Sequence, residues 1–189
     1  MHIFSPQALD FRTQGKNLRK LENVTLCGFF VALYIVVYSF NIIITPMVQI
    51  RLGYFVLAAA GLYGGPLFGM LVGIISDLMS MITTGGQGAS YFFGFTVSYA
   101  LMGFFFGLIF YRSKLTLIRG FMGAFFEFLV SIFLNTYWLC LMSGTPYLAS
   151  FYTRLPKSLI MLVVSTVLFY IVLSVLNRVF HMVSNYYHR

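Results

Sequence analysis

Three cations and one carboxylate stand out in a chain that is otherwise apolar. Arg51, Arg154 and Lys157 fall in short loops between long apolar segments, and Asp77 lies inside such a segment. A guanidinium or ammonium group binds a carboxylate through charge-assisted hydrogen bonds, and Arg offers two parallel N–H donors. The cations therefore suggest a site for an anionic small molecule. The alternative is that they only anchor helix ends at lipid headgroups.

A glycine-rich segment at 84–90 runs directly into a cluster of aromatic residues. Gly88 is followed closely by Tyr91, Phe92 and Phe95. Glycine lets a backbone approach a ligand closely, and aromatic faces stack on flat rings. Together with the cations, this segment predicts a pocket for a flat, anionic, partly aromatic molecule.

Polar residues inside apolar segments are the other candidates. Asp77 lies at a depth where a charge is costly, so it accepts hydrogen bonds from an amino-substituted heterocycle, pairs with a cation, or caps a neighbouring helix. Asn135 needs a partner on a facing helix or a ligand, and Trp138 is either a ligand contact or an interfacial belt residue. For Glu127 we expect snorkelling toward the inner surface or pairing with Arg119.

The sequence lacks the motifs of several enzyme classes. No GxxxxGK[ST] loop is present, so the chain is not expected to bind ATP as P-loop proteins do. No HExxH occurs and the histidines lie in or near the tails, which predicts no metal site and argues against a zinc protease. The run at 88–91 lacks the second glycine of an intramembrane serine protease motif, and no histidine follows in a later span. We therefore expect no enzymatic activity and no cofactor.

The segments that must position these residues are membrane-spanning helices. Of the 189 residues, 60% are hydrophobic and 8% charged, and the mean hydropathy is +0.89. Several apolar runs approach the roughly 20 residues that cross about 30 Å of hydrocarbon. We predict an all-α membrane protein, a single bundle of six transmembrane helices at about 24–45, 52–63, 66–83, 91–111, 121–142 and 158–180.

The basic residues indicate the orientation of this bundle. Of the 12 Lys and Arg residues, only Arg51, Arg154 and Lys157 fall on the side opposite the tails. The positive-inside rule then predicts cytoplasmic termini, and it explains the net charge of +8 better than a nucleic-acid partner does. We expect a cytoplasmic tail at 1–23, a transmembrane substrate-binding domain at 24–181 and a cytoplasmic tail at 182–189.

Several local runs resemble one known family. They are VALYIV at 31–36, GPLFG at 65–69, GIISDL at 73–78, YFFGFTVS at 91–98 and NTYWL at 135–139. Over nearly its whole length the chain resembles the substrate-binding S components of energy-coupling factor (ECF) vitamin transporters, and it looks most like the folate-specific member.

The resemblance implies a six-helix binding protein in the bacterial cell membrane, with its site near the extracellular face under the loops after helices one, three and five. It implies a scaffold transmembrane subunit and two cytoplasmic ATPases as partners, with the ATP used by those partners. The family docks through Ala-x-x-x-Ala on helix one, and Gly28 and Ala32 are the nearest match here. Glycine in the first place is a departure from that motif.

The resemblance and the chemistry together predict how folate binds. Its glutamate carboxylates should meet the three cations, and its pterin should stack on the aromatic residues and hydrogen-bond Asp77 or Asn135. The alternatives are an S component for riboflavin or thiamine and a small proton-coupled carrier. The predicted substrate-binding residues are Gln49, Arg51, Asp77, Gly88, Tyr91, Phe92, Phe95, Thr96, Asn135, Trp138, Arg154 and Lys157.

Overall fold

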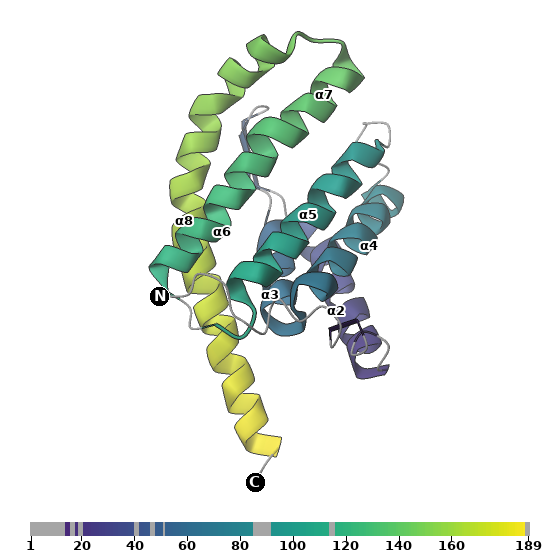
Figure 1. The fold of residues 1–189 in the computed structure, drawn as a ribbon, viewed down its shortest axis with the longest axis vertical. Coiled ribbons are helices and arrows are strands. Elements are labelled where there is room, and N and C mark those ends of the chain that lie inside the picture. Colours follow the sequence, from purple (N-terminus) through teal and green to yellow (C-terminus); the bar gives the residue numbers. More distant parts are fainter. Residues whose placement is uncertain are drawn as a thin grey trace.

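The fold is a bundle of helices (Figure 1). The structure is a computed structural model that describes residues 14–15, 18, 21–39, 42–45, 48–50, 52–84, 92–113 and 116–187. A short antiparallel hairpin, β1 (Ile42–Thr45) and β2 (Val48–Ile50), joins α2 to α3. The helices are α2 (Leu21–Ser39), α3 (Gly53–Gly64), α4 (Pro66–Thr84), α5 (Phe93–Phe110), α6 (Leu117–Leu129), the π-helical turn η3 (Val130–Asn135), α7 (Thr136–Ser143) and α8 (Tyr147–Tyr187).

Because α6, η3 and α7 form one continuous rod, the described chain has six helical segments, which confirms the predicted bundle. Five of these segments are long and apolar enough to cross a membrane. The exception is α3, whose 12 residues extend only about 18 Å. It is apolar on every side and buried from Gly53 to Leu62, as expected of a helix at the centre of a bundle.

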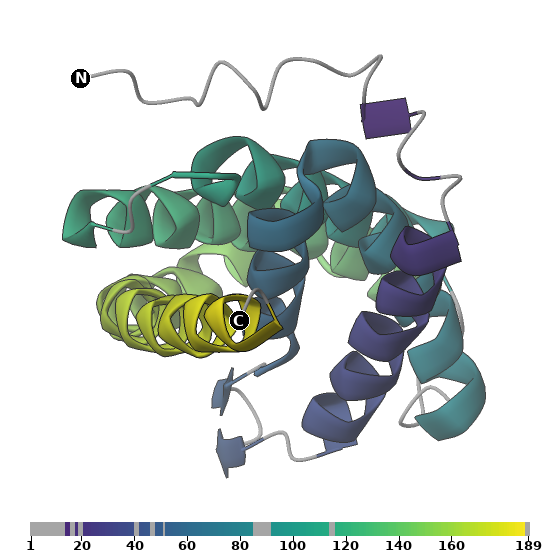
Figure 2. The same cartoon turned by 90° about the horizontal axis from the view of Figure 1, so that it is seen from below.

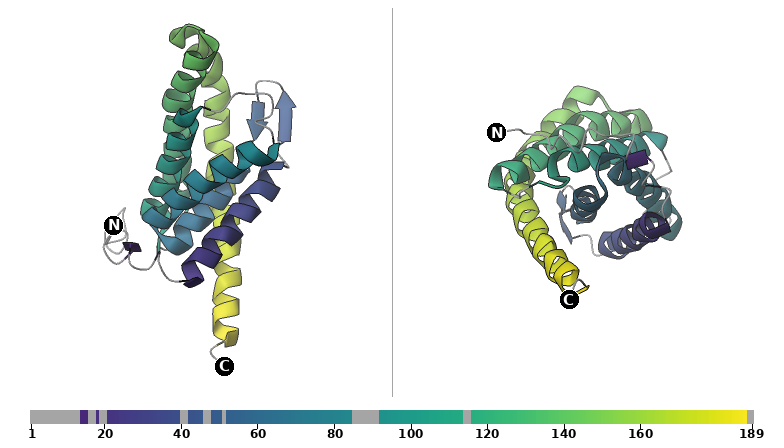
Figure 3. Two further views of the ribbon diagram at one scale, coloured as in Figure 1. Left: turned by 90° about the vertical axis from the view of Figure 1, so that its right-hand side faces the viewer. Right: turned by 60° about the horizontal axis from the view of Figure 1, so that its bottom comes forward.

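The views along the bundle show how α3 is enclosed. In Figure 2 and in the right-hand view of Figure 3, α6 and α8 lie on one side of α3 and α2 lies on the other. On a third side α4 and α5 pack unusually closely. A Cβ atom added to Gly103 would lie 2.1 Å from the backbone oxygen of Gly69. Small residues at both positions therefore allow the two backbones to touch.

Three predicted helix boundaries need correction. The first helix ends at Ser39 rather than near residue 45, because the β-branched run at 42–45 forms β1. The fifth segment begins at Leu117 rather than at 121. The sixth helix begins at Tyr147 rather than at 158, and Pro156 lies inside it. We had expected this proline to lie in a loop, but helices in lipid tolerate proline where neighbouring groups satisfy the freed carbonyl.

Candidate functional site

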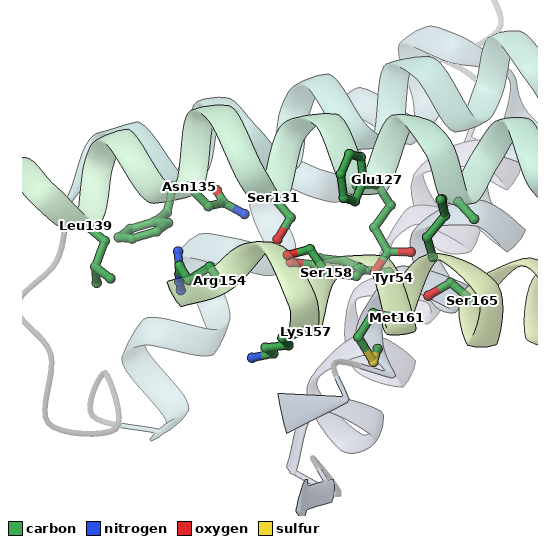
Figure 4. A pocket seen from close by; sticks show the side chains of 14 residues that line it. Tyr54, Glu127, Ser131, Asn135, Leu139, Arg154, Lys157, Ser158, Met161 and Ser165 are labelled. Atoms are coloured by element: carbon green, nitrogen blue, oxygen red, sulfur yellow. The ribbon is translucent and has the colours of Figure 1, made fainter. Parts of the chain in front are cut away.

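A polar cavity of about 100 Å³ lies between α8 and the rod formed by α6, η3 and α7 (Figure 4). One water molecule needs roughly 10–15 Å³, so the cavity has room for solvent or for part of a ligand. Tyr54 of α3 and Phe95 of α5 complete its wall. The cavity is thus bounded by four of the helical segments.

Helical spacing explains why polar side chains meet here. Glu127, Ser131 and Asn135 follow one another at intervals of four residues and therefore share one face of the rod. On α8, Arg154 and Ser158 are also four residues apart, and they project toward that face in Figure 4. The neighbouring α8 positions 159, 160 and 163 are exposed and apolar, as expected on a surface that faces lipid.

The π-helical turn ties the two walls together. Thr136 Oγ1 donates a hydrogen bond to the Ser131 carbonyl oxygen at 3.3 Å, five residues back, across the widened turn. Arg154 Nη1 in turn donates to Thr136 Oγ1 at 3.2 Å. This chain of hydrogen bonds holds the Arg154 guanidinium at the cavity wall. Turns of this kind occur frequently at functional sites.

Asn135 lines the cavity and has a buried acceptor that is not used within the described residues. Its side chain is only 5% exposed. The Oδ1 atom is buried, and none of the residues that the structure describes donates a hydrogen bond to it. A buried acceptor left in this state costs about 1–3 kcal/mol, so a ligand N–H or O–H group that reached it would be stabilised.

The charges in the wall are separated along the cavity. Arg154 and Lys157 are half-buried near the end of the bundle that carries the α7–α8 loop. Glu127, which is 9% exposed, lies two turns deeper, about 12 Å from Asn135 along the rod. The cavity therefore has a basic end and an acidic end.

Glu127 is the site residue that the sequence analysis missed. We had expected its carboxylate to snorkel to the inner surface or to pair with Arg119, but its side chain lines the cavity. The four-residue spacing from Glu127 to Ser131 and Asn135 would have placed it on the same face. The distance of Glu127 from the basic loop therefore did not predict that its side chain lines the cavity.

Asp77 makes an interhelical contact beside, and not within, the cavity wall. Its Oδ2 atom accepts a hydrogen bond from Thr96 Oγ1 at 2.6 Å, which joins α4 to α5. Both residues are buried, at 6% and 4% exposure, and they lie outside the cavity wall. A contact of either residue with the substrate stays a prediction, since one hydrogen bond leaves the carboxylate further acceptor capacity.

Of the predicted aromatic residues that the structure describes, one lines the cavity and two form a contact between α5 and α7 beside it. Phe95 lines the cavity. Trp138 Nε1 donates to Ser98 Oγ at 3.2 Å, and the indole packs on Phe92 with ring centroids 5.6 Å apart. A Cβ atom at Gly94 would lie 2.4 Å from the indole. Phe92 and Trp138 thus join α5 to α7 next to Phe95.

The remaining predicted residues lie outside what the structure describes or away from the cavity. Arg51, Gly88, Tyr91 and the side chain of Gln49 are outside the described residues, although the Gln49 backbone pairs with Ile43 in the hairpin. The substrate-binding predictions that share the cavity are Phe95, Asn135, Arg154 and Lys157.

The predicted docking residues lie on a different surface. Gly28 and Ala32 are exposed and line an apolar groove of about 460 Å³ between α2 and α4. No atom of the described residues lies within 4 Å of a Cβ built on Gly28. The groove floor is formed by Phe68, Leu71 and Ile75 of α4.

Comparison with known proteins adds independent information. Residues 18–178 match the family model described as the ECF-type riboflavin transporter, S component. The folate transporter FolT of Clostridium novyi (strain NT) is 32% identical over 154 residues, which cover 81% of this chain and 88% of that protein. The crystal structure of FolT bound with folic acid aligns with a TM-score of 0.71 at 24% identity, covering 80% of this chain and 92% of that one. At 24% identity, this structural similarity is evidence for the fold alone.

Proposed function

The chain belongs to the ECF-type riboflavin transporter S component family, and we propose that within this family it binds folate and delivers it inward as part of an ECF importer. It is a multi-pass membrane protein and a transporter component. The observation that carries the proposal is the charge separation in the cavity, with Arg154 and Lys157 at one end and Glu127 at the other.

The chemistry of the candidate vitamins distinguishes them in such a cavity. Folate carries two carboxylates at one end and an amino-substituted pterin at the other. Arg154 and Lys157 suit the carboxylates, since ionised partners make the stronger hydrogen bonds. Thiamine carries a cation, which these residues repel, and the ribityl chain of riboflavin is uncharged. Similarity to the folate transporter of Clostridium novyi supports the same assignment.

Riboflavin is the second candidate, because the matching family model is described by that vitamin. A flavin ring would also fit beside Phe95 and Tyr54. Its uncharged ribityl chain offers Arg154 and Lys157 no carboxylate to bind, whereas folate offers two. We therefore rank it below folate.

The exposed groove at Gly28 and Ala32 is proposed as the docking site for the scaffold transmembrane subunit. Small residues allow a second helix to approach closely, and the open space above Gly28 leaves room for it. We propose that two ATPases bound to that scaffold use the ATP, and that this chain has no cofactor and no enzymatic activity. We place it in the bacterial cell membrane with both termini in the cytoplasm.

Isothermal titration calorimetry of the purified chain tests the substrate. Folate, riboflavin and thiamine are titrated separately in detergent at equal ionic strength. We expect saturable binding of folate, and much weaker or no binding of the other two. Tighter binding of riboflavin than of folate would contradict the proposal and support the second candidate.

A further inference from the structure

We infer that Glu127 is the specificity-determining residue that recognises the pterin head, by accepting hydrogen bonds from the 2-amino group and the N3–H group of its pyrimidinone ring. The inference rests on the proposed function and extends it. Neither the family match nor the relatives' names assign a role to this carboxylate.

The position of Glu127 suits a ligand contact. It lies deep in the cavity, 9% exposed, with its carboxylate directed toward Tyr54 and α8 in Figure 4. The same cavity wall includes the apolar side chains of Phe128, Met161 and Leu162, together with Tyr54 and three serines. In such an environment a hydrogen bond to a charged group is stronger than in water.

The pterin edge and a carboxylate are geometrically matched. The 2-amino group and the adjacent N3–H group point in parallel, like the two N–H donors of a guanidinium group, and a carboxylate offers two acceptor oxygens to such a pair. A flavin presents N3–H between two carbonyl oxygens. If flavin N3–H bonded one carboxylate oxygen, a flavin carbonyl oxygen would face the other carboxylate oxygen. The two oxygens repel each other, so the site would disfavour the flavin.

The other end of the cavity fixes which way the ligand lies. Asn135 is about 12 Å from Glu127 along the rod, and Arg154 contacts the rod beside Asn135, at Thr136, so the tail and the pterin edge of folate would meet different turns. Tyr54 and Phe95 add ring side chains from α3 and α5 to the cavity wall. With the cations at one end and Glu127 at the other, only one orientation places each ligand group beside its complement.

A purely structural role is the competing explanation, in which Glu127 only joins α6 to α8. That role predicts that replacing the carboxylate weakens every ligand equally. The inference predicts an effect that depends on the edge of the ligand. An analogue of folate in which oxygen replaces the 2-amino group has the flavin type of edge on the folate framework, so it separates the two explanations.

The test is calorimetric titration of folate and of this 2-oxo analogue into the parent chain, Glu127→Gln and the control Glu22→Gln. Glu22 is exposed on α2, far from the cavity wall. We expect the parent and the control to prefer folate by about 10-fold or more, and Glu127→Gln to lose about 10- to 100-fold in folate affinity with little change for the analogue.

Three results would overturn the inference. One is a parent chain that binds folate but does not prefer it to the analogue. This result can be obtained without any folded variant. Another is an equal loss for both ligands in Glu127→Gln, and the third is no loss for either; in all three cases the proposed folate function stands. A parent chain that binds no folate would instead overturn the proposed function together with the inference.

Discussion

Replacing Arg154 by glutamine tests the basic end of the cavity. The side chain is half-buried and donates to Thr136, so glutamine keeps a polar group there but removes the charge. A hydrogen bond to a charged partner contributes about 1.5–3 kcal/mol, and solvent screens part of it at a half-buried site. We therefore expect a loss of about 2 kcal/mol, or about 30-fold in folate affinity.

Two controls make this prediction specific to the carboxylates of folate. The dimethyl ester of folate lacks the anionic end, so Arg154→Gln should weaken it little. Arg112→Gln removes an exposed cation that lies over Tyr111 at the far end of α5, and it should leave both affinities unchanged. The affinities are measured by titration, with the fluorescence of Trp138, the only tryptophan in the chain, as the signal. An equal loss for folate and its ester would refute the reasoning.

Three further variants test separate parts of the structure. Gly28→Leu should abolish folate uptake by the complete transporter in cells without changing folate binding, and unchanged uptake would refute the proposed docking groove. Gly103→Ala should lower the thermal unfolding temperature, because its Cβ would lie 2.1 Å from a backbone oxygen and overpacking costs about 1–3 kcal/mol. The control Gly28→Ala has open space around its Cβ and should leave the unfolding temperature unchanged. Thr96→Val removes a hydrogen bond from the buried Asp77 carboxylate and should destabilise the fold by about 1–3 kcal/mol. Folate affinity should not change. A loss of affinity as large as that of Arg154→Gln would show that Asp77 belongs to the ligand site.

The membrane bundle could be predicted from sequence because lipid leaves the backbone few choices. Spanning segments must satisfy their own hydrogen bonds, so long apolar runs become helices, and the turn at Gly64 and Gly65 separates α3 from α4 as expected. The boundaries were harder. The run at 42–45 is as apolar as a helix but β-branched, and hydropathy alone does not distinguish a helix from a strand.

The candidate site was predictable only in part, because sequence shows which residues need a partner but not which partner they find. Asn135 and Arg154 were expected to face a ligand, and they do line the cavity. Asp77 needed a partner just as much, but the neighbouring helix supplies Thr96. Glu127 was judged by its distance from the basic loop, whereas its face of the helix decides its surroundings.

Native mass spectrometry of the chain, purified from cells without added vitamin, shows whether Arg154 holds folate in the cavity. We expect a complex heavier than the protein by the mass of one folate, which disappears in Arg154→Gln and persists in Arg112→Gln. A bound mass that corresponds to riboflavin, or a folate complex that survives the loss of Arg154 unchanged, would contradict this expectation.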